Sequence, residues 1–239
     1  MRMADYLKKR KKVTPLPVED RGLCLQCLRS PVTCICAHLK PFDPKTKFVI
    51  LTHLREAQNR IGTGRLSHLM LTSSEMLIGT DFTGHARVNE LVQDGRNHCV
   101  ILYPGEHSMN LSTFSPKERG SLFPESKALV VFVIDGTWFT APKILRLSKN
   151  LQSLPKICFD PPAPSRFRIR RQPKPYCHST VEAIHHTIDL LGDSRGFNVG
   201  KREHDHLLYV FDQMVEQQID YGARPKLFCQ WSPKKRPRA

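Results

Sequence analysis

The sequence lacks long apolar runs, and this absence narrows the class of protein. No stretch of about 18 or more apolar residues occurs, so we expect no transmembrane helix. The first residues also lack the apolar core of a secretory signal. We therefore expect a cytoplasmic protein that has no membrane partner.

Acidic residues are scarce relative to basic ones. The 239 residues include 37 Lys and Arg but only 22 Asp and Glu, which gives a formal net charge of +15. Much of the excess lies at the two ends, residues 1–12 and 232–239, which we expect to be flexible arms that attract phosphates without reading sequence. A charge of this size favours a nucleic-acid binder. A merely soluble basic protein, attraction to an anionic membrane, and a localisation signal in either arm are the alternatives.

Half of the eight cysteines lie close together, with the spacing C-x2-C-x6-C-x-C. Zn²⁺ takes four thiolates in a tetrahedron, and a C-x2-C turn presents two of them to one metal. This pattern predicts a closed, structural zinc knuckle within residues 21–40. Reduced thiols without metal and an iron–sulfur cluster are the alternatives, and a disulfide is disfavoured in the cytosol. The four predicted ligands are Cys24, Cys27, Cys34 and Cys36.

Hydrophobic periodicity predicts alternating strands and helices, which is typical of an α/β fold with a mainly parallel sheet. Ser179 and Glu182 form a capping-box pattern at the start of one helix. Residues 106–127 show no regular pattern, and 161–177 resemble a loop rich in Pro and Arg. The predicted strands are 47–53, 76–79, 98–103, 128–134 and 156–159, and the predicted helices are 63–72, 86–93, 139–150, 179–191 and 202–221.

The strongest predicted strand, 128–134, is apolar on both faces and leads directly into Asp135-Gly136-Thr137-Trp138. An acid at the carboxyl end of a central parallel strand lies where open α/β sheets bind ligands. Gly136 permits a sharp turn, and Trp138 offers an indole ring for stacking. A helix cap for Asp135 and core packing for Trp138 are the alternatives.

Five motifs in a fixed order resemble the DTW-domain family, the tRNA-uridine aminocarboxypropyltransferases related to SPOUT-type enzymes. The resemblance covers about residues 21–195. In two places the chain departs from the family, with Leu54 where Pro is usual and Gly62 where Asn is frequent. The motifs are the cysteine cluster, His53-Leu54-Arg55-Glu56 with Gly62-Thr63-Gly64-Arg65-Leu66, Leu102-Tyr103-Pro104-Gly105, Asp135-Gly136-Thr137-Trp138 and Ser179-Thr180-Val181-Glu182-Ala183.

The resemblance implies a SPOUT-like trefoil knot and S-adenosylmethionine (SAM) as the co-substrate bound in it. It divides the chain into a basic arm (1–20), a cysteine module (21–40), a catalytic domain (41–231) and a basic tail (232–239). Glu182 is expected either to cap its helix or to bind the SAM amino group. The residues expected to line the SAM site are Leu102, Pro104, Gly105, Ile134, Gly136, Thr137, Ser179, Thr180 and Glu182.

The same resemblance implies transfer of the 3-amino-3-carboxypropyl group of SAM to N3 of a uridine in tRNA, with release of methylthioadenosine. Asp135 is the candidate general base or orienting group for N3–H, and Trp138 the candidate stacking residue. An ordinary Asp pKa near 3.9 suits a base poorly, so the first role requires a raised pKa. A SPOUT-type RNA methyltransferase and a non-catalytic zinc-containing RNA-binding protein are the rival hypotheses.

Two groups of arginines are candidate RNA contacts. In the loop 165–171, alternate arginines would share one face of an extended segment, and Phe167 could stack on a base. One of these arginines is also a candidate for the SAM carboxylate, and a solvated basic loop is the alternative. The loop arginines are Arg166, Arg168 and Arg170, and the second group is Arg55, Arg60 and Arg65.

Overall fold

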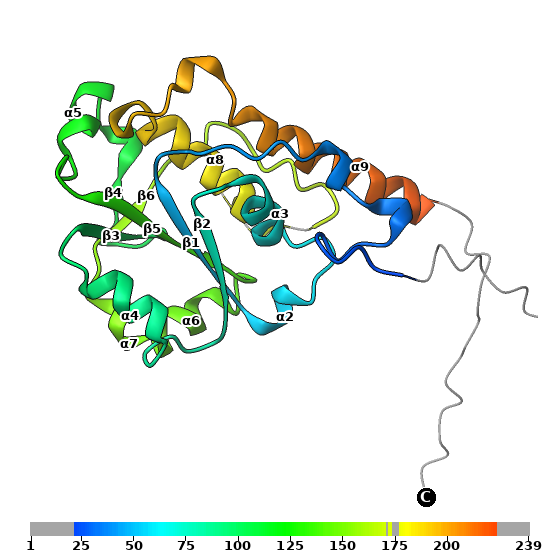
Figure 1. Cartoon of the computed structure of the whole chain (residues 1–239), viewed down its shortest axis with the longest axis horizontal. Coiled ribbons are helices and arrows are strands. Elements are labelled where there is room, and N and C mark those ends of the chain that lie inside the picture. Colours follow the sequence, from blue (N-terminus) through cyan, green and yellow to red (C-terminus); the bar gives the residue numbers. More distant parts are fainter. Residues whose placement is uncertain (1–21, 171, 174–176, 224–239) are drawn as a thin grey trace, which may run out of the picture.

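The sheet is parallel throughout, as the computed structural model shows for residues 22–170, 172–173 and 177–223 (Figure 1). Six strands lie in the order β2-β1-β5-β3-β6-β4. The predicted α/β fold with a parallel sheet is confirmed, whereas the two predicted basic arms lie outside the described residues. The strands are β1 (Lys47–Thr52), β2 (Ser74–Ile78), β3 (Asn97–Leu102), β4 (Met109–Asn110), β5 (Ala128–Asp135) and β6 (Lys156–Cys158).

Strand β5 occupies the middle of the sheet because its side chains are apolar on both faces. It pairs with β1 on one side and β3 on the other. Val131 and Val133 belong to one core cluster, and Val130 and Phe132 to the other. A strand buried on both faces carries this continuous apolar pattern.

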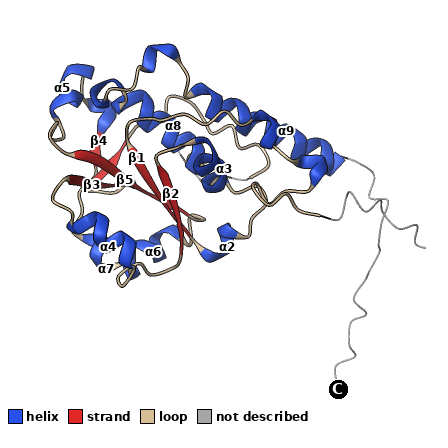
Figure 2. Ribbon diagram, viewed as in Figure 1, coloured by secondary structure: helices blue, strands red, loops and turns tan. Residues whose placement is uncertain are grey.

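Helices cover both faces of the sheet (Figure 2). On one face lie α3 (Thr63–Met70), α8 (Thr180–Leu191) and α9 (Asp205–Ala223), which share a core cluster with β1, β3 and β5. On the other face lie α4 (Ala86–Gln93), α6 (Ala141–Leu147) and α7 (Lys149–Gln152). The remaining helical segments are α2 (Leu54–Ala57), α5 (Pro116–Ser121) and the short 3-10 turns η2 (Pro31–Thr33), η3 (Cys36–His38), η4 (Leu111–Thr113), η5 (Asp193–Arg195) and η6 (Val199–Lys201).

Two segments differ from their predicted structure. The helix predicted at 139–150 is divided into α6 and α7 at Ser148, which is buried and whose hydroxyl accepts a hydrogen bond from the Phe82 amide at 3.0 Å. The segment predicted to be irregular contains β4 and α5. Helix α5 begins with a capping box formed by Ser115 and Glu118, a pattern that the sequence contains and that the prediction overlooked.

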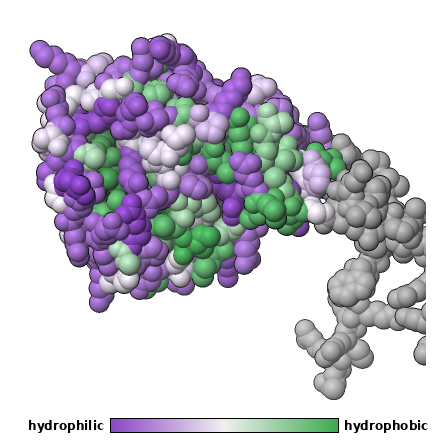
Figure 3. All heavy atoms as spheres, viewed as in Figure 1, coloured by the Kyte–Doolittle hydropathy of each residue, from purple (hydrophilic) through white to green (hydrophobic). Residues whose placement is uncertain are grey.

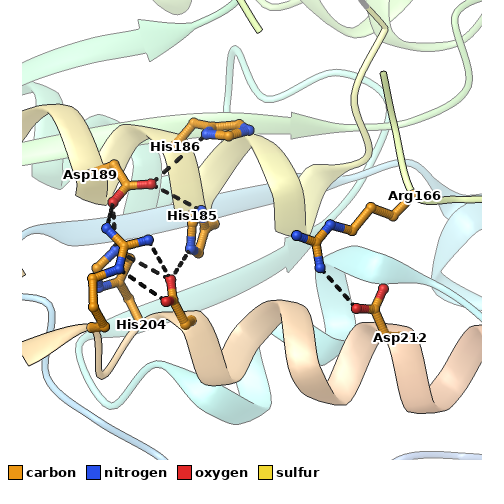
Figure 4. A network of polar contacts seen from close by, with 8 residues as sticks. Arg166, His185, His186, Asp189, His204 and Asp212 are labelled. Atoms are coloured by element: carbon orange, nitrogen blue, oxygen red, sulfur yellow. Dashed lines mark hydrogen bonds and ion pairs between the residues drawn. The ribbon is translucent and has the colours of Figure 1, made fainter. Parts of the chain in front are cut away.

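Helices α8 and α9 are joined by a network of histidines, carboxylates and one arginine (Figure 4). Nε2 of His185 lies 2.7 Å from Asp205 Oδ1, and Nε2 of His204 lies 2.8 Å from Asp189 Oδ1. Arg202 donates to both carboxylates. Burial alone would raise the pKa of Asp189, but the hydrogen bond from His204 and the nearby positive charges lower it to about 2. The network therefore fixes α8, whose first turn contributes to the site described below.

The surface is mainly hydrophilic, as the sequence without long apolar runs predicts. Hydrophilic residues cover most of the face in Figure 3, and hydrophobic residues gather there in smaller patches. None of the helices in the described part of the chain is long and apolar enough to cross a membrane. The cytoplasmic location stays a prediction.

Candidate active site

A cavity of about 470 Å³ lies where β3, β5 and β6 end. It is bounded by the loops that follow these strands, by the segment around residue 170 and by the first turn of α8. This is the edge of a parallel sheet at which α/β proteins bind ligands. Ten predicted site residues line it: Leu102, Pro104, Gly105, Ile134, Asp135, Gly136, Trp138, Arg170, Ser179 and Thr180.

Thr137, which was also predicted to line the cofactor site, instead shapes the loop. Its backbone amide donates to the Thr140 hydroxyl at 2.8 Å, and its own hydroxyl accepts from the Thr140 amide at 3.0 Å. Gly136 is tightly enclosed, because an added Cβ would lie 2.8 Å from Thr140 Oγ1. The Gly-Thr pair therefore bends the chain sharply between Asp135 and Trp138.

Asp135 lines the cavity and is only 5% exposed. Its carbonyl accepts a hydrogen bond from the His53 amide at 2.8 Å, which ties the motif to the loop after β1. Its Oδ1 accepts from the Thr180 hydroxyl at 2.7 Å. Gly64 packs against the same carboxyl, since a Cβ at that position would lie 2.3 Å from Oδ2. Glycine is therefore required there for space.

Burial raises the pKa of Asp135. The hydrogen bond from Thr180 opposes this effect, the negative charge of Glu56 adds to it, and the positive charge of Arg170 opposes it. Desolvation dominates because the charged form of a buried carboxyl loses its hydration. The general-base role predicted for Asp135 required a raised pKa, and the direction of this shift meets that requirement.

An ion pair between Glu56 and Arg170 lies beside Asp135. The two side chains approach to 3.4 Å, and Glu56 is 9% exposed. The second oxygen of Glu56 accepts from the Asn59 amide group at 3.1 Å. The sequence contained Glu56 within a family-like motif, but no role was predicted for it.

Two aromatic residues are exposed in the motif loop, the segment 136–140 after β5. Trp138 is 42% exposed and lines the cavity, so the alternative that it packs in the core is wrong. Phe139, which follows it, is 84% exposed and was not considered in the sequence analysis. The sequence did contain a signal for Phe139, since it is an aromatic residue directly after Trp138, the predicted stacking residue.

The loop 165–171, the arginine loop, is not extended, so the prediction that its arginines share one face is wrong. Arg166 pairs with Asp212 at 2.9 Å and Arg168 pairs with Glu216, both acids lying on α9, whereas Arg170 lines the cavity. The tertiary contact of Phe167 explains this shape.

Phe167 is 2% exposed and packs edge-to-face on Phe211 of α9, with ring centroids 5.2 Å apart. The ring also lines the cavity from this position, and its stacking on a base stays a prediction. Part of the predicted loop, residues 171 and 174–176, lies outside the described residues.

Glu182 caps its helix, which confirms the capping box. Its carboxylate accepts hydrogen bonds from the Ser179 amide and hydroxyl at 2.8 and 2.6 Å. It also accepts from the Ser165 hydroxyl at 2.7 Å and the Arg166 amide at 2.6 Å. Glu182 does not line the cavity; it fastens the loop that carries Arg170 to the start of α8.

The second group of predicted RNA-contact arginines lies near the same site. Arg55 is exposed on α2, directly after His53, whose amide contacts Asp135. Arg65 is half-buried and donates to the carbonyl of Ala57 at 3.0 Å. Their contacts with RNA stay predictions.

The four clustered cysteines are brought together as the spacing predicted. All four sulfurs lie within 4.8 Å of one another, and Sγ separations are 3.5 Å for Cys24–Cys36 and 3.7 Å for Cys27–Cys34. Zn–S bonds of about 2.3 Å in a tetrahedron place sulfurs about 3.8 Å apart, so the donor set fits zinc. Leu28, next to Cys27, has a left-handed backbone (φ 56°) that closes the turn.

The fold and the site together define an α/β protein with a ligand cavity at the carboxyl edge of a parallel sheet and a buried acid inside it. The DTW domain model matches residues 21–219, and the chain therefore belongs to the DTW-domain family. This confirms the resemblance found in the motifs.

Similar proteins carry one shared name, tRNA-uridine aminocarboxypropyltransferase 2. The protein of that name from Mus musculus is 27% identical over 228 residues, which cover 89% of this chain and 70% of that protein. The Macaca fascicularis protein is 24% identical over 218 residues (88% and 68%), and the Drosophila melanogaster protein 27% over 182 residues (73% and 68%). No solved structure matches the chain significantly. These names agree with the prediction of an enzyme that transfers an alkyl group.

Proposed function

We propose that this protein transfers the 3-amino-3-carboxypropyl group of SAM to N3 of a uridine in tRNA. The observation that carries this proposal is the buried carboxyl of Asp135, which lines the cavity and belongs to the family's own motif. In the reaction, N3 of uridine loses its proton and attacks the γ-methylene carbon of SAM. The carbon–sulfur bond breaks, and the neutral thioether methylthioadenosine leaves. Asp135 receives the proton or orients the N3–H group.

The donor is assigned to the cavity at the ends of β3, β5 and β6. The proposed backbone and apolar contacts are Leu102 at the end of β3, Gly105 after it and Gly136 after β5, all of which line the cavity. The SPOUT-like trefoil knot and a catalytic domain spanning 41–231 are part of this proposal. The convergence of three strand-end loops on one cavity supports the assignment of the donor site.

The acceptor uridine is assigned to the exposed side of the motif loop. Trp138 and Phe139 present aromatic rings to solvent, and unpaired RNA bases stack on such rings. Arg55, Arg65, Arg166, Arg168 and Arg170 are the proposed basic contacts of the RNA. Arg55 is exposed on α2 and free to meet a phosphate, whereas Arg166 and Arg168 already hold acids of α9.

The decisive experiment is mass spectrometry of nucleosides from tRNA incubated with the purified protein and SAM. A uridine heavier by the aminocarboxypropyl group, together with released methylthioadenosine, is the expected result. A methyl-sized gain with S-adenosylhomocysteine would replace the proposal with the methyltransferase hypothesis. If tRNA stayed unmodified while ribosomal RNA gained the group, the assignment of tRNA would be wrong, and modification of neither RNA would favour a non-catalytic RNA-binding protein.

We also propose that Cys24, Cys27, Cys34 and Cys36 hold one structural zinc ion, because their sulfur separations match a tetrahedral site. The knuckle packs on the core, with Cys27 buried in the same cluster as α8 and α9. Zinc removal by a chelator should therefore lower the melting temperature of the whole protein.

The zinc content of the purified protein, measured by mass spectrometry of metals, should be one ion per chain and should be lost in Cys27→Ser. The matched control Cys158→Ser changes a half-buried cysteine outside the cluster and should keep the metal. Protein that melts identically with and without chelator would contradict the structural role.

A further inference from the structure

Arg170 differs from every other basic side chain near the cavity. It is the single Lys or Arg among the described residues that line the cavity. Arg166 and Arg168 precede it in the same loop, but their side chains are 56% and 55% exposed and are paired with acids of α9. A negatively charged group of a bound ligand would therefore meet Arg170 and not its neighbours.

Glu56 supplies the opposite charge next to Arg170, from just outside the cavity lining. It is nearly buried at 9% exposure and contacts Arg170 at 3.4 Å. This separation is long for a charge-assisted hydrogen bond, which is typically about 2.7–2.9 Å. The guanidinium fork of Arg170 therefore retains donors for a second, closer acceptor.

We infer that Arg170 and Glu56 form the subsite for the amino-acid end of the donor, with the donor carboxylate on Arg170 and the donor ammonium group on Glu56. This inference rests on the proposed function, since it concerns the part of SAM that is transferred. The amino-acid end carries one negative and one positive charge, and the ion pair offers one partner to each. When the donor binds, the Glu56–Arg170 pair would be replaced by two pairs, Arg170 with the donor carboxylate and Glu56 with the donor ammonium group. No buried charge would then be left without a partner.

The subsite also explains which carbon of SAM is presented. Arg170, which Glu56 contacts, lines the same cavity as Asp135. A donor held by its amino-acid end would therefore place the propyl chain, and not the methyl group, beside the proposed base. Reacting atoms must lie about 3–3.5 Å apart and in line, so anchoring this chain selects the transferred group by position.

A second consequence concerns the product. Methylthioadenosine has lost the amino-acid end, so it makes neither contact with the subsite. The modified uridine retains the charged group, which leaves with the RNA. The subsite therefore distinguishes the donor from the spent cofactor.

The test compares three ligands on one set of variants. SAM and S-adenosylhomocysteine carry the amino-acid end, and methylthioadenosine does not. Binding of each is measured by calorimetry to the wild type, Arg170→Gln, Arg170→Lys and Glu56→Gln. The matched control is Arg96→Gln, which changes an exposed arginine that pairs with an acid outside the cavity.

Arg170→Gln should weaken SAM and S-adenosylhomocysteine by about 10- to 100-fold, the value of a hydrogen-bonded charged group, and should leave methylthioadenosine unchanged. Arg170→Lys should weaken the first two ligands less, because it keeps the charge and loses only the fork. Glu56→Gln should act in the same selective manner, and Arg96→Gln should change none of the three.

Retained binding of methylthioadenosine also shows that a variant is folded. An equal loss of all three ligands would assign Arg170 a structural role and overturn the inference, as would unchanged binding of SAM. A wild type that binds none of the three would overturn the proposed function itself, and this failure is distinct because it precedes any substitution.

Discussion

Asp135 combines burial with one short hydrogen bond, and the two act on its carboxyl in opposite directions. Burial raises its pKa, and the Thr180 hydroxyl only partly offsets the effect. A carboxyl whose pKa is raised on folding stabilises the protein fully below its ordinary pKa, and this contribution is lost as the pH rises through the folded pKa. The ionised form needed for base catalysis is thus the form that the fold tolerates least.

Asp135→Asn should reduce the transfer rate by about 10²–10⁴-fold, because the proton acceptor is lost. In the wild type, the rate should fall at acid pH through a pKa above the ordinary value of about 3.9.

Asp135→Asn should also melt at a higher temperature than the wild type at neutral pH, since its side chain cannot ionise. Single-turnover rates across pH and thermal melting check both expectations. Asp81→Asn, on the exposed loop after β2, serves as control, and full turnover in Asp135→Asn would refute the assigned role.

Gly64→Ala should displace the Asp135 carboxyl, because the added methyl group would lie 2.3 Å from Oδ2. We expect a loss of stability of roughly 1–3 kcal/mol, the usual cost of overpacking, together with loss of transfer. Gly84→Ala is the matched control, since nothing lies within 4 Å of its Cβ position. The double variant Gly64→Ala/Asp135→Ala should regain stability, as expected of two residues in contact. Urea denaturation of the wild type, Gly64→Ala, Asp135→Ala and the double variant measures the coupling free energy between the two positions. If the losses of stability in the two single variants simply added in the double variant, the clash would be contradicted.

The site residues that were predicted from the sequence are placed by local structure, whereas those that were missed are placed by contacts between distant parts of the chain. Asp135 ends β5 and Trp138 lies in the loop directly after it, so their position at the sheet edge is a local property. Gly64 and Glu56 gain their importance only from neighbours that approach through the fold. A single sequence contains no local signal for such an approach.

At the scale of elements, periodicity predicted the strands of the sheet and the long helices well. Helix α4 matches its prediction from end to end, and α8 begins where its capping box placed it. Two of the errors lie where a distant contact sets the local shape, whereas α5 was missed although its capping box is a local pattern. The loop containing Phe167 is folded back by the ring of Phe211, and Ser148 divides a helix by bonding to the amide of Phe82. The knot stays a prediction, because threading is not encoded in local patterns.

Glu182→Ala should cost about 2–4 kcal/mol of unfolding free energy, because four buried or half-buried donors lose their acceptor. The matched control is Glu118→Ala, which removes the same capping-box residue from the exposed helix α5 and should cost only about 0.5–1 kcal/mol. Urea denaturation gives both values. Equal losses in the two variants would show that the contacts of Glu182 to the arginine loop contribute nothing to stability.

At the scale of the whole molecule, the net charge of +15 should make tRNA binding strongly dependent on salt. The arginines differ in how much they can contribute, because an arginine that already holds an acid gains less from a phosphate. Arg55 is exposed and forms no ion pair within the described part of the chain, whereas Arg168 pairs with Glu216.

Arg55→Gln should reduce the slope of log K against log salt concentration by about 1, the value expected for one lost phosphate contact. Arg168→Gln, matched in chemistry, should change the slope less. Filter binding of tRNA over a series of salt concentrations checks this difference. A larger effect of Arg168→Gln would mean that its pair with Glu216 opens on RNA binding and would reverse the ranking.

The central position of β5 has a consequence for how the chain is made. Strands β1 and β3 flank β5 and do not pair with one another, although both are synthesised before it. Until residues 128–135 leave the ribosome, the inner edges of two apolar strands have no partner, and the long-range pairings of the sheet must wait. The strand that joins β1 to β3 ends in Asp135 itself. The pairing that connects these two parts of the sheet therefore also places the proposed base at the sheet edge, before β6, α8 and α9 are made.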